Sequence, residues 1–143
     1  MPEIVLPIHL TVLGVTVLGI LIADHEAFLW IRGKKPVLEF KKIFRLHIWV
    51  GIGLIGMIIT GFLMFWPAHT YLLTKSPAFL GKMFFVALLV GNSFFLGEML
   101  KISTKRTFAS LTPKEKRPMY ISGALSTISW VSAATLAFFI YPF

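Results

Sequence analysis

The sequence predicts an all-α protein, an integral membrane four-helix antiparallel bundle with both chain termini extracytoplasmic. Its 143 residues are 57% hydrophobic and only 14% charged, whereas soluble globular chains carry about 25% charged residues. The mean hydropathy is +0.82. The apolar residues fall into long runs, and the basic residues gather in alternate loops between these runs. Both patterns are typical of polytopic membrane proteins.

Four apolar runs are long enough to cross a bilayer, which requires about 20 residues. They lie at residues 4–31, 44–66, 77–100 and 119–141. The first run lacks the basic start of a signal peptide, since Glu3 is the only charge before Asp24, and it is too long for a signal sequence. We therefore expect it to be retained. The connections are short, so residues 1–143 are predicted to form a single transmembrane domain with an up-down-up-down course.

The positions of the basic residues predict the orientation. Of the 14 lysines and arginines, 12 lie in the first and third connecting regions, and the other two are Lys75 and Lys82. The positive-inside rule places the first and third loops in the cytoplasm. The 12 residues are Arg32, Lys34, Lys35, Lys41, Lys42, Arg45, Lys101, Lys105, Arg106, Lys114, Lys116 and Arg117. We expect an integral protein of a prokaryotic cytoplasmic membrane.

Ionisable side chains inside the apolar runs are the candidate functional residues, because such groups are costly in lipid. At about 1.5 Å per residue, His25, His47 and Glu98 each lie about 12 to 13 Å from their span centres, toward the cytoplasmic side. His9 lies about 12 Å in the other direction, and His69 about 20 Å, in an expected turn. The sequence thus predicts one inner layer of two imidazoles and a carboxylate.

An interfacial interpretation of the inner layer is also open. At this depth Asp24, His25 and Glu26 would lie near the lipid headgroups at the edge of a hydrocarbon core about 30 Å thick. In that case Asp24 and Glu26 are expected to be solvated or salt-bridged rather than catalytic. The expected partners are Arg32, Lys34 and Arg45.

Haem b is the first cofactor that the histidines suggest. Membrane b-type cytochromes hold iron with imidazoles from facing helices, and the absence of cysteine excludes covalent haem attachment. We expect His25 and His47 to be the axial ligands, with Gly51 leaving room for the macrocycle. A second haem between His9 and His69 is a weaker expectation, because their depths differ. The expected partners of the haem propionates are Arg45, Lys42 and Arg32.

One stretch resembles a known family. Arg45-Leu-His47-Ile-Trp49, followed by Thr60-Gly61-Phe62-Leu63, is similar to the R-x-x-H-W and T-G-x-x-L pattern of small four-helix bacterial b-type cytochromes. That group includes the cytochrome subunits of nickel-iron hydrogenases. The resemblance covers residues 45–63, and one residue separates His47 from Trp49 where the pattern has none. It implies that His47 is an axial ligand and that electrons pass to or from quinol.

Two alternatives remain at this point. His25, His47, Glu98, His9 and His69 could instead supply nitrogen and oxygen ligands to a non-haem iron, copper or zinc ion. A helical di-iron site is disfavoured, because the chain has no Glu-x-x-His repeat. The other alternative is a cofactor-free accessory subunit that packs against larger membrane proteins.

The expected partners follow from these interpretations. They are the lipid bilayer and either other membrane redox subunits or further copies of the chain, with quinone as a candidate small molecule. Nucleic acid is not expected, because the basic residues are explained by membrane topology. A role as the electron-transfer subunit of an oxidoreductase is the only enzymatic role that the sequence suggests, since no phosphate-binding loop or nucleophile motif occurs.

Overall fold

The computed structural model describes residues 2–66 and 75–140 and contains four long helices in this part of the chain. All four are long and apolar enough to cross a membrane, which confirms the all-helical class and the four predicted spans. A short 3-10 helix, η1, lies in the third connection. The elements are α1 (Pro2–Ile31), α2 (Phe40–Phe65), α4 (Pro77–Ser103), η1 (Phe108–Ser110) and α5 (Pro113–Ile140).

Three helices, α2, α4 and α5, extend beyond their apolar runs at the basic end of the molecule. Helix α5 begins at Pro113 rather than at residue 119. A capping box explains this start, since the Thr112 hydroxyl accepts a hydrogen bond from the Glu115 backbone N–H at 3.2 Å and the Glu115 carboxylate accepts one from the Thr112 N–H at 3.2 Å. A hydropathy pattern cannot predict this helix start, because the first turn of α5 is polar.

Local chemistry also ends α1 and starts α4. Gly33 has φ +73°, a left-handed conformation that glycine adopts without steric cost, and it reverses the chain after α1. The Lys34 N–H bonds back to the Leu29 carbonyl at 2.9 Å, as in other glycine helix ends. At the other end of the bundle, the Ser76 hydroxyl caps α4 by accepting from the Phe79 N–H at 3.2 Å, with Pro77 in the first turn.

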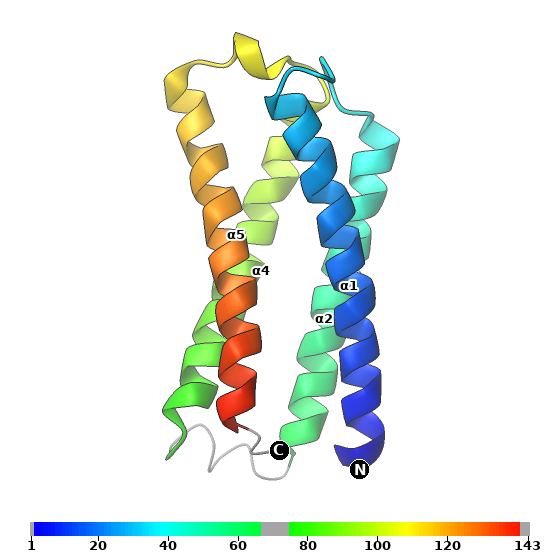
Figure 1. Ribbon diagram of the computed structural model, residues 1–143, viewed down its shortest axis with the longest axis vertical. Coiled ribbons are helices and arrows are strands. Elements are labelled where there is room, and N and C mark those ends of the chain that lie inside the picture. Colours follow the sequence, from blue (N-terminus) through cyan, green and yellow to red (C-terminus); the bar gives the residue numbers. More distant parts are fainter. Residues whose placement is uncertain (1, 67–74, 141–143) are drawn as a thin grey trace.

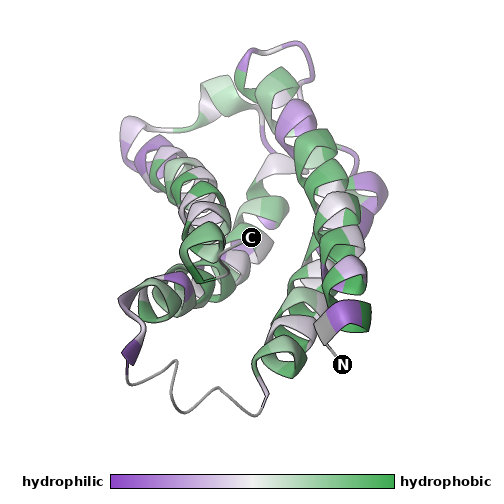
Figure 2. Ribbon diagram, turned by 60° about the horizontal axis from the view of Figure 1, so that its bottom comes forward, coloured by the Kyte–Doolittle hydropathy of each residue, from purple (hydrophilic) through white to green (hydrophobic). Residues whose placement is uncertain are grey.

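The bundle consists of two helix pairs. Helix α1 packs along α2, and α4 packs along α5, whereas contact between the pairs is much less extensive and involves mainly α2 and α4. Figure 1 shows the two pairs side by side, with the start of α1 and the end of α5 at the same end. Hydrophilic residues are concentrated toward the helix ends and the connections, and the middle of each helix is mainly apolar (Figure 2).

Small residues bring α1 and α2 together. Thr16 is fully buried, and a Cβ atom on Gly53 would collide with the Thr16 hydroxyl oxygen and lie 2.9 Å from its Cβ. A Cβ atom on Gly19 would lie 3.3 Å from the Trp49 ring. Close backbone approach at glycine is a common mode of helix association in lipid. Packing within this pair therefore accounts for Gly19 and Gly53.

A buried polar pair connects α4 to α5. The Asn92 side-chain N–H donates to the Ser122 carbonyl at 3.2 Å, and the Ser122 hydroxyl donates to Asn92 Oδ1 at 2.6 Å. Both side chains are buried. Ser122, Ser129 and Ala133 are all buried on α5, and their spacing of seven and four residues places them on one helix face.

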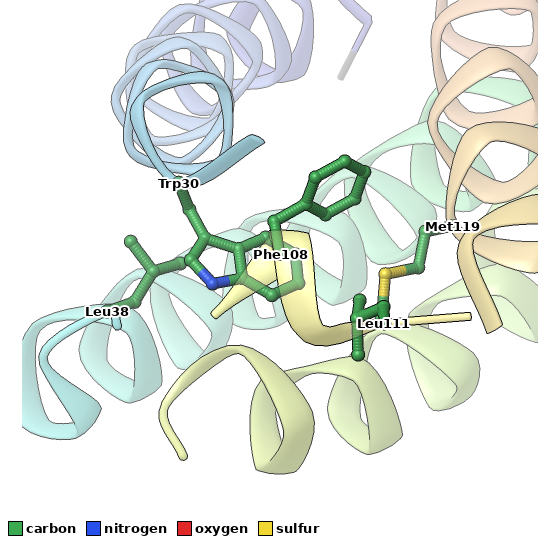
Figure 3. Close-up of a cluster of buried hydrophobic side chains, with 5 residues drawn as sticks. All are labelled: Trp30, Leu38, Phe108, Leu111 and Met119. Atoms are coloured by element: carbon green, nitrogen blue, oxygen red, sulfur yellow. The ribbon is translucent and has the colours of Figure 1, made fainter. Parts of the chain in front are cut away.

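The two helix pairs meet at both ends of the bundle. At the basic end, Trp30 packs edge-on against Phe108 with ring centroids 5.2 Å apart, and its indole N–H donates to the Arg106 carbonyl at 2.9 Å. Leu38, Leu111 and Met119 complete this cluster (Figure 3). At the other end, Phe65 of α2 and Phe79 of α4 pack edge-on at 5.0 Å. Between these two contacts, the space that separates the helix pairs is less tightly filled.

Candidate functional site

A cavity of about 280 Å³ lies between the two helix pairs, in the half of the bundle where α1 begins and α5 ends. All four long helices contribute to its walls, which are almost entirely aliphatic and aromatic. Two ionisable side chains, His9 and Lys82, are among its lining residues. Apolar pockets with a few polar groups are the usual form of cofactor and ligand sites.

His9 is held in place by Thr60. The imidazole is 7% exposed, and its Nδ1 lies 2.7 Å from the Thr60 hydroxyl oxygen. That hydroxyl donates its own proton to the Gly56 carbonyl, 2.8 Å away, so toward His9 it acts as the acceptor. With the Thr60 hydroxyl donating to Gly56, the matching neutral tautomer carries its proton on Nδ1 and leaves the lone pair on Nε2.

This arrangement leaves Nε2 of His9 available. Among the described residues, the only hydrogen bond recorded for the His9 side chain is the one through Nδ1. Gly61 lies beside the ring, because a Cβ atom there would be 3.7 Å from His9 Cε1. Histidines that bind metals commonly donate the other ring N–H to an oxygen, which fixes the tautomer. His9 and Thr60 have this relationship.

Lys82 places a positive charge at the wall of the same cavity. The side chain is partly buried, and Nζ lies 5.9 Å from the centre of the Phe65 ring. The salt bridges found within residues 2–66 and 75–140 do not include Lys82, and no acidic side chain lines the cavity. In the sequence Lys82 lies within the apolar run 77–100, and a lysine within such a run is itself a signal of function.

The structure places the expected inner-layer residues apart from this cavity. His25 is exposed, and His47 is half-buried beside α4, where a Cβ atom on Gly97 would be 3.7 Å from His47 Nε2. Glu98 is exposed and pairs with Lys101 at 3.1 Å. Within the described ranges, no three histidine or carboxylate side chains form a group that could hold a metal ion.

The remaining expected site residues have other surroundings. Arg45 is exposed, and Gly51 has no atom within 4 Å of the position of a Cβ. Lys42, expected beside a haem propionate, instead donates to Glu26 at 2.7 Å. His69 lies outside the described residues, so its placement relative to the cavity is not part of the site described here.

Glu26 forms salt bridges, as the interfacial interpretation of the inner layer expects, but its partners are other residues than the expected ones. Its carboxylate is within 2.6 Å of Lys35 Nζ and 2.7 Å of Lys42 Nζ, and the residue is 5% exposed. The expected partners had been Arg32, Lys34 and Arg45. The observed pairs connect the last part of α1 to the following turn and to the start of α2, which is a structural role.

Comparison of the chain with protein-family models, with curated proteins and with solved structures gives no match.

Proposed function

We propose that this protein is a membrane haem b protein that carries electrons, and that it holds the haem in the cavity between its two helix pairs. The observation that supports this proposal is the state of His9: buried in an apolar cavity, bonded through Nδ1 to Thr60, and free at Nε2. An imidazole of this kind is the usual protein ligand of a non-covalently bound haem iron. His9 thus replaces His25 and His47 as the proposed ligand.

The donor set fits haem better than a non-haem metal ion. A structural zinc site requires four protein ligands, and a helical di-iron site requires several carboxylates. Among the described residues, the cavity walls provide one imidazole and no carboxylate. Three methionines also line the cavity, and a thioether is a known second axial ligand of haem. They are Met57, Met64 and Met83.

A haem in this position would supply a one-electron redox couple. The chain's own residues have simple roles around it. Thr60 keeps the proton on Nδ1 of His9 and orients the ring, so that Nε2 presents its lone pair to the cavity. The apolar walls limit access of water, and such an environment would set the electrostatic cost of changing the charge on a bound iron. The packing of α1 along α2 keeps His9 beside Thr60.

The same proposal includes orientation and partners. By the positive-inside rule the basic connections face the cytoplasm, so the His9 cavity lies in the outer half of a prokaryotic cytoplasmic membrane. We assign the protein to a larger redox assembly, in which other membrane subunits or membrane quinone exchange electrons with it. The large apolar surface that the helices expose is suited to lipid and to such neighbours.

A visible absorption spectrum tests the proposal. After expression in haem-replete cells and purification in detergent, the protein should show a Soret band and, on reduction, α and β bands. The haem should extract into acidic acetone, because the chain has no cysteine to anchor it. A colourless protein without iron under these conditions would contradict the proposal.

A further inference from the structure

Lys82 has a charge that the described protein does not balance. Its ammonium group lies at the wall of an apolar cavity, its Nζ is 5.9 Å from the centre of the Phe65 ring, and among the described residues no carboxylate lines the cavity. A cation surrounded by apolar groups is costly, and the cost is offset when an anion binds it. An occupant of the cavity can supply that anion.

We propose that the cavity recognises an amphipathic anion, whose carboxylate binds Lys82 and whose apolar body lies between the helix pairs. For the haem of the proposed function, this carboxylate is a propionate, and in that form the inference rests on the proposed function. A fatty acid presents the same chemistry. The inference assigns Lys82, which lies on a different helix pair from His9, as the residue that binds the head group.

The depth of the lining residues supports an amphipathic occupant. Lys82 is five residues from Pro77, where α4 begins, and thus about 7.5 Å from that end of the helix. The lining residues farthest from this end are Leu13, Leu54, Leu89 and, on α5, Trp130. The cavity therefore has its cation near the membrane surface and an inner end without an ionisable group. A molecule with a charged head and an apolar body matches this polarity.

The cavity also opens toward lipid. Leu10 of α1 and Phe138 of α5 line it, yet they are 54% and 68% exposed. Helices α1 and α5 belong to different pairs and make little contact with each other, and Figure 1 shows them on the same side of the bundle. An amphipathic molecule dissolved in the bilayer can therefore reach Lys82 laterally, without crossing the packed ends of the bundle.

Binding of acid and ester forms of one ligand tests the role of Lys82. Cofactor-free protein in detergent is titrated with iron protoporphyrin IX and with its dimethyl ester, and binding is followed by the absorption change. The wild type should bind the free acid at least about tenfold more tightly, because a charge-assisted hydrogen bond is lost with the ester. Lys82→Met should reduce the ratio to about one, and Lys82→Arg should retain the preference.

Lys75→Met is the matched control, because Lys75 is exposed and does not line the cavity. Its acid-to-ester ratio should equal that of the wild type. If Lys82→Met fails to fold, Lys82→Gln replaces it. The wild-type ratio is itself decisive in that case, because equal affinity for acid and ester would overturn the inference.

A second pair of probes separates this inference from the haem proposal. Spin-labelled stearic acid and its methyl ester are titrated in the same way, with immobilisation of the label as the readout. If the fatty acid is preferred through Lys82 and neither porphyrin binds, the inference stands with lipid as the source and the haem proposal fails. If porphyrin binds without preference for the acid, and the fatty acid shows none, haem binding stands and the inference is wrong.

Discussion

Thr16 of α1 packs directly against Gly53 of α2. Thr16 is completely buried, its hydroxyl donates to the Val12 carbonyl of its own helix at 2.6 Å, and its side chain occupies the position that a Cβ atom on Gly53 would take. This contact is possible only because position 53 of α2 is a glycine, which has no Cβ atom. It also determines how α1 is rotated about its axis, and therefore which of its side chains face α2.

We expect Gly53→Ala to destabilise the α1 and α2 pair. Overpacking a close contact costs about 1 to 3 kcal/mol, which exceeds the gain in helix propensity of about 1 kcal/mol for alanine over glycine. Thermal unfolding in detergent, followed by circular dichroism, measures the effect. Gly51→Ala is the control, because a Cβ atom there has no neighbour within 4 Å. Equal melting temperatures for the two variants would contradict the packing argument.

Glu26→Gln should destabilise the basic end of the bundle by about 1 to 3 kcal/mol. The reason is that the buried Glu26 carboxylate loses two charge-assisted bonds. Their donors, Lys35 and Lys42, are partly exposed to solvent, which limits the loss. Glu98→Gln is a matched control, since its pair with Lys101 is exposed on both sides and such pairs contribute about 0.5 kcal/mol or less. Urea or SDS unfolding titrations would compare the two. A larger loss at Glu98 would contradict this assignment.

The hydrogen bonds between Asn92 and Ser122 should couple α4 to α5. A double-mutant cycle with Asn92→Ala and Ser122→Ala is expected to give a coupling free energy of about 0.6 kcal/mol, the average for hydrogen bonds between membrane helices, and at most about 1.7 kcal/mol. Ser93→Ala serves as the control, because the Ser93 hydroxyl bonds to the Val90 carbonyl within its own helix. No coupling in the cycle would mean that the bond from the Ser122 hydroxyl to Asn92 Oδ1 adds nothing to the packing of the pair.

His9→Ala should abolish haem retention if the proposed site is correct, because the iron loses its protein ligand. Thr60→Val should weaken retention by about 10- to 100-fold, the usual effect of removing the partner that orients a ligand histidine. Thr127→Val is the matched control, since Thr127 bonds to the Gly123 carbonyl within α5 and is exposed. Absorbance per protein measures the bound haem.

His25→Ala and His47→Ala should retain haem, because His25 is exposed and neither residue lines the cavity. If these two variants lose haem and His9→Ala keeps it, the cofactor lies at the basic end of the bundle. That outcome would restore the ligand pair expected from the sequence and remove His9 from the site.

Single cysteines should reveal the orientation in this cysteine-free chain. Thr107→Cys lies in the exposed third connection, and Thr74→Cys lies in the second, outside the described residues. With the basic connections in the cytoplasm, a membrane-impermeant thiol reagent added to intact cells should label position 74 and leave position 107 unlabelled. The reverse pattern would place the His9 cavity in the inner half of the membrane.

The sequence by itself determined the number, the length and the helical nature of the spans. In lipid, each backbone N–H and C=O must be bonded within the segment, so a long apolar run has few alternatives to a helix. The apolar runs therefore match α1, α2, α4 and α5 closely. They fail only at polar ends such as residues 113–118, where the Thr112 and Glu115 capping box starts the helix in a region that hydropathy leaves out.

Only the tertiary structure decided which histidine faces the interior. His9 and His25 are 16 residues apart, and at about 100° per residue they lie on nearly opposite faces of one helix. Depth along the helix could not choose between them, because depth says nothing about rotation. The contact of Thr16 with Gly53 fixes that rotation. His9, two turns from Thr16 and on the same face, is thereby buried against Thr60, and His25 is left exposed.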